Sequence, residues 1–328
     1  MFAMEPQSIP GIFLWGIEVI KAIQRLKSPA LTAVLKFVTE LGTDKFYVPV
    51  IIFIFWWIDE KKGFRLGILI LLSAWVNAFL KSTFKQSRPY DFDPSLGLAY
   101  ESTYGTPSGH AQYSLCFWVP IAAWLAEGKP GRKRIAIWAA TIFFILLIGF
   151  TRLYLGVHFP TDLLVGWGLG AIILFLMYKL SPLFIKYLAG QTRSQNILAA
   201  LAAFIMISIF PGDRSFPAIF LGFCLGYSIM KNNFPFSAQS EIKEKKFMIL
   251  LLRCLTGFAS LVIVYFVLQL LLPGEGSLFS YIPFWGHASP FYDLGRFIRY
   301  GVVGFWASAG APMVFQRMGL SLKKDDEA

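Results

Sequence analysis

Charged residues are scarce in this chain of 328 residues. Asp, Glu, Lys and Arg make up 15% of it, whereas 56% of the residues are hydrophobic. Soluble globular domains average about 25% charged residues, and several apolar stretches here approach the roughly 20 residues that cross a hydrocarbon core. The composition therefore excludes an ordinary soluble protein and predicts an all-α, polytopic bundle of transmembrane helices.

Cysteine and histidine are also rare, with three of each. Cys116, Cys224 and Cys254 fall within apolar segments, and their spacing is that of neither a disulfide pair nor a zinc site. We expect them to be small hydrophobic residues. The opening residues MFAMEPQSIP lack the basic start and the cleavage site of a secretory signal peptide, so none is expected.

Acidic residues are outnumbered, which leaves a formal net charge of +11. The basic residues gather in short loops between apolar runs, a pattern that sets membrane orientation, and we expect no nucleic-acid partner. Loops 59–65, 127–134, 179–195 and 231–246 and the C-terminal tail fall on one face, which the positive-inside rule makes cytoplasmic. The opposite face receives 83–107, 153–160, 212–215 and 273–293. The N-terminal lysines on that face are an exception to the rule.

Nine apolar segments predict membrane-spanning helices, and three regions follow from them. Residues 1–43 mix apolar and charged residues at helical spacing, which indicates amphipathic helices at the membrane interface. Residues 44–180 form a core, and residues 181–328 form a C-terminal transmembrane extension. The predicted spans are at about 44–58, 64–82, 108–126, 134–152, 161–180, 196–211, 216–231, 247–272 and 294–314.

Three polar motifs fall on the outer face of the core. The segment KSTFKQSRP ends the second span, PSGH begins the third, and TRLYLGVHFPTD joins the fourth to the fifth. Because the spans alternate, a compact bundle brings these helix ends together. The residues concerned are Lys81, Arg88 and Pro89; Pro107, Ser108, Gly109 and His110; and Thr151, Arg152, His158 and Asp162.

These residue types suit a phosphate ester. Lys81, Arg88 and Arg152 are three cations that can surround a phosphoryl group. Free N–H groups at a helix start, here at Ser108 and Gly109, favour an anion. The two histidines can supply a nucleophile and a general acid, and an Asp four residues after a His can hold one ring nitrogen.

The three motifs resemble the signature of the type 2 phosphatidic acid phosphatase (lipid phosphate phosphatase) superfamily: K-x6-R-P, P-S-G-H and S-R-x5-H-x3-D. They match in order and in spacing, and the resemblance covers about residues 44–180. Thr151 stands where the family usually has Ser, so a hydroxyl is kept, and we expect its hydrogen bond to be kept too.

The resemblance implies a role for each motif residue. His158 is the nucleophile and forms a phosphohistidine, Asp162 orients it, and His110 protonates the leaving group. It also implies that no metal or other cofactor is needed, and the sequence shows no carboxylate cluster of the kind that holds one. The implied phosphate ligands are Lys81, Arg88, Ser108, Gly109 and Arg152, and the supporting residues are Thr151, Pro89 and Pro107.

The predicted function is hydrolysis of a lipid phosphomonoester or diphosphate within a bacterial-type cytoplasmic membrane, with the site facing the periplasm or exterior. Substrates implied by the resemblance are phosphatidic acid, phosphatidylglycerol phosphate, isoprenoid (di)phosphates, sphingoid-base phosphates and lipid A phosphate. Transfer of the phosphoryl group to another alcohol is an open alternative. So is a lipid transporter or scaffold that has kept the fold without turnover. Vanadium haloperoxidases share the pocket but are soluble.

Other polar residues have simpler interpretations. Any one motif alone is explained by basic residues snorkelling at helix ends or by an ordinary helix cap. Asp91, Asp93 and Glu101 are interpreted as solvated loop charges, with contact to a substrate headgroup left open. Arg253 is interpreted as a snorkelling residue, and His287 as an interfacial one. The extension, with Asp213 and Arg214 at a membrane edge, either packs on the core, forms a homodimer or shapes the path of the lipid.

Overall fold

The structure is a computed structural model, and it describes residues 10–189, 192–209, 215–238, 246–274, 276–282, 285–286 and 289–321. All regular elements in these ranges are helices, which confirms the all-α prediction. The chain divides into two compact units: residues 1–48 with 76–181, and residues 49–75 with 182–328. His287, Asp213 and Arg214 lie outside the described residues.

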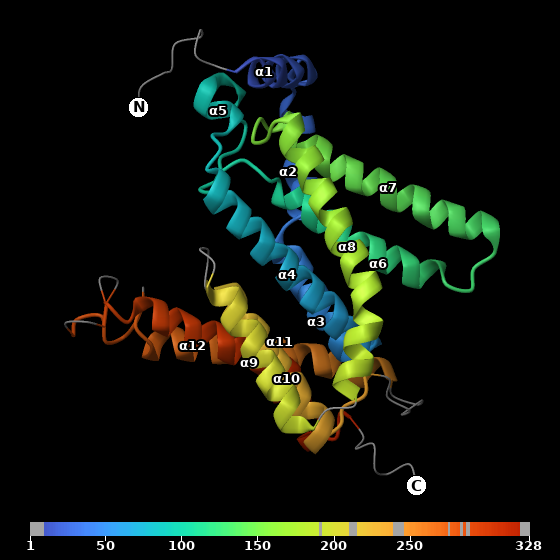
Figure 1. The fold of residues 1–328 in the computed structure, drawn as a ribbon, viewed down its shortest axis with the longest axis vertical. Coiled ribbons are helices and arrows are strands. Elements are labelled where there is room, and N and C mark those ends of the chain that lie inside the picture. The colour runs from blue at the N-terminus through green and yellow to red at the C-terminus, as the bar shows by residue number, and fades with distance from the viewer. Residues whose placement is uncertain are drawn as a thin grey trace. The chain divides into compact units, whose positions relative to one another are not determined.

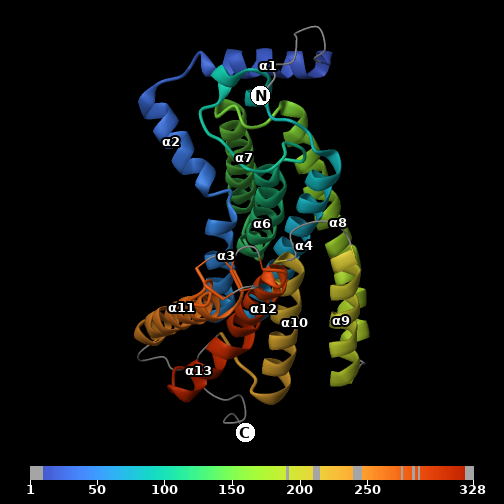
Figure 2. The same ribbon diagram turned by 90° about the vertical axis from the view of Figure 1, so that its left-hand side faces the viewer.

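The first unit carries all three motifs. Its α6 and α7 are neighbouring helices joined by the short loop at 127–130, and α1 lies across the end of the unit that also holds α5 and the turn between α7 and α8 (Figures 1 and 2). The elements that lie wholly or partly in it are α1 (Gly11–Gln24), α2 (Pro29–Glu40), α3 (Asp44–Phe53), α4 (Glu60–Phe84), α5 (Pro89–Phe92), the short 3-10 helix η3 (Pro94–Leu96), α6 (Gly109–Ala126), α7 (Gly131–Tyr154) and α8 (Pro160–Ala189).

Local sequence explains where the helices of this unit begin. Ser28 caps α2 by accepting a hydrogen bond from the Leu31 N–H (3.2 Å), and Pro29 occupies the first helical position, where its missing N–H costs nothing. Ser108 caps α6 in the same way through the Ala111 N–H (3.4 Å). The caps place the first residues of α6, including His110, at the end of the unit where the other motifs lie.

The second unit contains the C-terminal extension and packs around aromatic side chains. The Trp56 side chain is fully buried, donates its indole N–H to the Ala307 carbonyl (2.9 Å) and lies edge-on to Phe258 and Phe315. The remaining elements, two of them π-helices labelled η, are η2 (Ile54–Ile58), α9 (Arg193–Ile209), α10 (Ser215–Asn233), α11 (Lys246–Leu271), α12 (Tyr292–Phe305), η4 (Trp306–Gly310) and α13 (Ala311–Arg317).

Glycines let α10 and α12 approach closely in this unit. A Cβ built on Gly222 would lie 1.9 Å from the Gly301 carbonyl oxygen, and one built on Gly304 would lie 2.5 Å from the Ile219 carbonyl oxygen. Gly222 and Gly226 have the small-xxx-small spacing by which membrane helices bring their backbones together. The close packing of α10 on α12 therefore depends on glycine, with no side chain, at these positions.

Arg253 corrects one interpretation made from the sequence. Its side chain is fully buried and does not snorkel towards water. The guanidinium donates to the carbonyl oxygens of Leu320 (2.7 Å) and Ala238 (2.9 Å) and lies over the Phe236 ring. Through its Nε and Nη1 atoms, this arginine links the segments that carry Leu320 and Ala238 to α11.

A helix occupies each of the nine predicted spans. Four of the described helical segments are long and apolar enough to cross a membrane: Glu60–Phe92, Gly131–Tyr154, Pro160–Leu183 and Phe247–Leu271. A fifth is added if the bent pair Pro29–Glu40 and Asp44–Ile58 is one broken span. The chain is a multi-pass membrane protein, while its exact number of crossings and the interfacial position of residues 1–43 stay predictions.

Candidate active site

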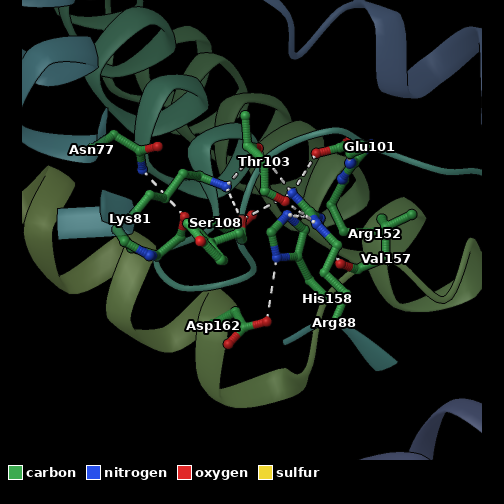
Figure 3. Close-up of polar contacts among 12 residues, drawn as sticks. Asn77, Lys81, Arg88, Glu101, Thr103, Ser108, Arg152, Val157, His158 and Asp162 are labelled. Atoms are coloured by element: carbon green, nitrogen blue, oxygen red, sulfur yellow. Dashed lines mark hydrogen bonds and ion pairs between the residues drawn. The ribbon is translucent and has the colours of Figure 1, made fainter. Parts of the chain in front are cut away.

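The three motifs meet at one end of the first unit. Lys81 comes from the last turn of α4, Arg88 from the start of α5 and His110 from the first turn of α6. Arg152 lies in the last turn of α7, and His158 and Asp162 flank the start of α8. Figure 3 shows the side chains of Lys81, Arg88, Arg152, His158 and Asp162, which converge from separate elements. The co-location expected from alternating spans is therefore what the structure shows.

His158 and Asp162 form a buried pair. The Nδ1 atom of His158 lies 3.3 Å from Oδ2 of Asp162, and both side chains have almost no exposed surface. Oδ2 also accepts the Phe159 N–H (2.8 Å), while Oδ1 accepts hydrogen bonds from Gln86 (2.8 Å) and from the Thr106 hydroxyl. With its oxygens held in this way, Asp162 fixes the His158 ring with Nε2 on the far side.

Arg88 lies against the free side of that ring. Its Nη1 is 3.3 Å from His158 Nε2 and donates to the Val157 carbonyl (2.7 Å). Its Nε and Nη2 donate to the carbonyls of Thr103 (2.7 Å) and Tyr104 (3.0 Å). A guanidinium held by this many acceptors is pre-organised, so a phosphoryl group at Nε2 would meet a fixed cation.

Glu101 joins the two motif arginines. One carboxylate oxygen accepts from Arg88 Nη2 (2.8 Å), and the other accepts from Arg152 Nη2. Figure 3 shows both guanidinium groups directed at this carboxylate. The solvated interpretation of Glu101 from the sequence is therefore wrong. Its contact with the two arginines could not be predicted from the sequence, because the motif pattern contains no acidic residue in this loop.

Asp91 and Asp93 are also engaged. The Asp91 carboxylate accepts the backbone N–H of Arg88 (2.7 Å), which fixes the start of α5. The Asp93 carboxylate accepts from Ser95 and pairs with Lys21 of α1 (3.1 Å). Both aspartates hold the conformation of loop 85–108, which connects the first motif to the second.

Lys81 and Arg152 complete the cationic side of the site. The Lys81 ammonium donates to the Tyr104 carbonyl and to the Thr103 hydroxyl (3.3 Å). Arg152 donates from Nη1 to the Thr39 hydroxyl (2.7 Å), and its buried Nε has no hydrogen-bond partner. Buried polar groups are normally paired, so this N–H remains available for an anion in the site.

His110 and the α6 start face the same space. The buried Nε2 atom of His110 has no hydrogen-bond partner. The Ser108 N–H donates to the Asp162 backbone carbonyl (3.1 Å), which joins the second motif to the third. Asn77 donates to the Pro107 carbonyl (3.3 Å) and to Gln112 (2.9 Å), fixing the turn before α6. Asn77, Gln86, Thr103 and Thr106 are supporting residues that the sequence did not reveal.

Thr151 and Pro89 take structural positions. The Thr151 side chain is fully buried, and its hydroxyl donates to the Ile148 carbonyl one turn earlier in α7 (2.6 Å). A serine hydroxyl reaches the same carbonyl from this position, so the change from the family pattern keeps that bond. Pro89 occupies the first position of α5, where proline's fixed φ suits a helix start.

His158 lies in the turn between α7 and α8, and electrostatics favours a neutral ring there. Burial holds the pKa of His158 well below its ordinary value, and the positive charges of Arg88, Arg152 and Lys81 lower it further. A neutral imidazole with Nδ1–H directed at Asp162 carries its lone pair on Nε2. That lone pair is what a nucleophile needs.

Comparison with known proteins identifies the class. Residues 62–186 match the PAP2 superfamily, and residues 215–324 match the transmembrane extension of PAP2 superfamily phosphatases. Phosphatidylglycerophosphatase B of Bacillus subtilis is 33% identical over 167 residues, which cover 48% of this chain and 79% of that protein. The chain therefore belongs to the PAP2 superfamily of membrane lipid phosphatases, as the three motifs predicted.

Two further comparisons each cover about half of the chain. An undecaprenyl-diphosphatase of Sulfolobus acidocaldarius is 28% identical over 174 residues, covering 51% of this chain and 78% of that protein. A crystal structure of a transmembrane PAP2 type phosphatidylglycerolphosphate phosphatase from Bacillus subtilis aligns with a TM-score of 0.47 and 27% identity. That alignment covers 53% of this chain and 88% of the other.

Proposed function

We propose that the protein removes phosphate from a lipid phosphomonoester or diphosphate through a phosphohistidine on His158, without a metal ion, at the outer face of a cytoplasmic membrane. One observation carries the proposal: Nε2 of a buried, Asp-oriented histidine faces the guanidinium of Arg88 at 3.3 Å. A phosphoryl group in reach of this nucleophile would have its oxygens beside a fixed, phosphate-binding cation.

The first step forms the P–N bond. His158 Nε2 attacks phosphorus, the ester P–O bond breaks, and the leaving alkoxide takes a proton from His110. Asp162 stabilises the positive charge that develops on the His158 ring. Arg88, Arg152 and Lys81 balance the charge on the phosphoryl oxygens.

The second step regenerates the enzyme. His110, now neutral, takes a proton from water while the water oxygen attacks phosphorus and the P–N bond breaks. Inorganic phosphate leaves, and His110 and His158 return to their starting protonation states. The same two residues thus act in both directions, and atoms and protons balance over the cycle.

A lipid substrate follows from where the site lies. The catalytic groups occupy the ends of apolar helices, so a lipid tail stays in the bilayer while its phosphate reaches the cations. The similarity to a phosphatidylglycerophosphatase and an undecaprenyl-diphosphatase supports phosphatidylglycerol phosphate and an isoprenoid diphosphate as the first two candidates. A homodimer through residues 181–328 remains a proposal.

The test is phosphate release by purified wild type, His158→Ala and His110→Ala, with these two lipids, phosphatidic acid and sphingosine phosphate as substrates. We expect His158→Ala to lose activity by orders of magnitude on every substrate that the wild type hydrolyses. A chelator should leave the wild-type rate unchanged. Full activity of His158→Ala, or loss of activity with the chelator, would refute the proposed mechanism.

A further inference from the structure

The N-terminal helices α1 and α2 lie outside residues 62–186, the stretch that matches the phosphatase family. They nevertheless belong to the same compact unit as the site. Contacts from this segment reach three different catalytic groups: Arg152, His110 and the turn that carries His158. Each contact is made by a different part of the segment.

Thr39, in the last turn of α2, contacts Arg152. Its hydroxyl accepts a hydrogen bond of 2.7 Å from Arg152 Nη1, and the residue is 6% exposed. Hydrogen bonds with a charged donor are stronger than neutral ones, especially where water is excluded. Nη2 of the same guanidinium is bound to Glu101, an anion that a phosphate would compete with. Thr39 is uncharged, so its bond can persist when a phosphate is bound.

The end of α2 also fixes His110. The Nε2 atom of the His110 ring is buried and has no hydrogen-bond partner. Gly42, just after α2, lies so close that a Cβ on it would be 2.9 Å from His110 Cδ2 and 2.8 Å from an Ile148 methyl group. The ring is therefore held from one side, with Nε2 left for the leaving group.

Helix α1 supports the nucleophile turn. The Gln24 amide donates to the carbonyls of Leu96 (2.9 Å) and Tyr154 (2.8 Å), which joins the loop before Glu101 to the end of α7. Phe159, next to His158, is buried among apolar side chains of α1. A Cβ on Gly16 of α1 would lie 2.6 Å from the Phe159 ring.

We propose that residues 16–42 complete the catalytic site, with Thr39 and Gly42 as positioning residues for Arg152 and His110. The proposal rests on the roles given above to those two groups. Thr39 acts on phosphate binding through Arg152. Gly42 acts on protonation of the leaving group through His110. The two effects separate in kinetics, which distinguishes positioning from simple stabilisation of the fold.

The first test compares Thr39→Val, which removes the hydroxyl at nearly constant shape, with Thr39→Ser, which keeps it. Losing one charge-assisted hydrogen bond to Arg152 should raise KM and the inhibition constant for inorganic phosphate about tenfold, with a smaller change in kcat. Thr39→Ser should restore both constants to near wild type. Equal constants in Thr39→Val and wild type would overturn the role of Thr39.

The second test compares Gly42→Ala with Gly11→Ala, a control at a position of α1 where an added Cβ meets nothing within 4 Å. Displacing His110 should lower kcat about tenfold for a lipid phosphate, whose alkoxide needs a proton. It should lower kcat much less for p-nitrophenyl phosphate, whose leaving group departs unprotonated. Gly11→Ala should match wild type on both substrates.

Parallel measurements separate misfolding from positioning. Thermal unfolding in detergent checks that each variant is folded, and rescue by Thr39→Ser does so independently. Equal loss on both substrates in a folded Gly42→Ala would overturn the assignment to His110. Undiminished activity of His158→Ala alongside these variants would instead refute the proposed function. The two failures are therefore distinguishable.

Discussion

At the scale of single residues, two of the three cations in the site already bind a carboxylate of the chain itself. The Glu101 carboxylate binds Arg88 and Arg152, the two arginines that the family resemblance assigns to phosphate. A phosphate entering the site must share these donors with Glu101 or displace it. We therefore expect Glu101 to weaken anion binding while it keeps both guanidinium groups in place.

Replacing Glu101 by Gln tests this competition. The neutral amide is a weaker acceptor for two arginines, so inorganic phosphate and vanadate should inhibit Glu101→Gln about tenfold more strongly than wild type. The control is Asp93→Asn, in the same loop, whose carboxylate pairs with Lys21 instead. Weaker inhibition of Glu101→Gln would show that the carboxylate chiefly orients the arginines.

The low pKa of His158 predicts the acid side of the pH profile. Only the neutral ring is nucleophilic, and a lowered pKa keeps the ring neutral below the ordinary histidine value of about 6.5. The pH profile of kcat/KM reports the free enzyme. The midpoint of its acid limb should therefore lie below pH 6.5. The second ionisation of the substrate, near pH 6, is titrated separately. An acid-limb midpoint at or above pH 6.5 that the substrate's ionisation does not explain would contradict this role of His158.

At the scale of helices, hydropathy and motif spacing predicted much of the fold and the meeting of the three motifs, while the roles of the motif residues stay predictions. Long apolar runs and helix caps are local signals, and the structure has a helix at each predicted span. Glu101, Thr39 and the burial of Arg253 could not be predicted. Their roles depend on contacts between segments distant in sequence, such as the pair formed by Thr39 and Arg152.

The close α10–α12 pair gives a prediction about stability. Gly222→Ala places a methyl group against the Gly301 carbonyl and should destabilise the protein by about 1–3 kcal/mol, the usual cost of overpacking. Gly301→Ala is the matched control, since its Cβ would meet only the Ala218 carbonyl at an ordinary 3.6 Å. Thermal unfolding in detergent compares the two. Equal stability of both variants would mean that the helices do not pack this closely.

At the scale of the whole molecule, orientation decides which leaflet supplies the substrate. The positive-inside pattern predicts that the loop after α5 lies outside and that the loop between α6 and α7 lies in the cytoplasm. Ser95 and Lys129 are exposed positions in these two loops. They are therefore suitable sites for a labelling experiment in whole cells.

One cysteine introduced at either position reports the orientation. In intact cells a membrane-impermeant maleimide should label Ser95→Cys, and should label Lys129→Cys only after permeabilisation. The wild-type chain, with its own three cysteines, gives the background. The reverse pattern would place the site on the cytoplasmic side and would require substrate from the inner leaflet.

The proposed covalent intermediate on His158 is tested most directly by trapping it. Purified protein is mixed with a substrate labelled in its terminal phosphate and quenched in alkali, and the labelled residue is located by peptide mapping. We expect phosphohistidine at His158 in wild type and no label in His158→Ala. Label at another residue, or label that persists in His158→Ala, would contradict it.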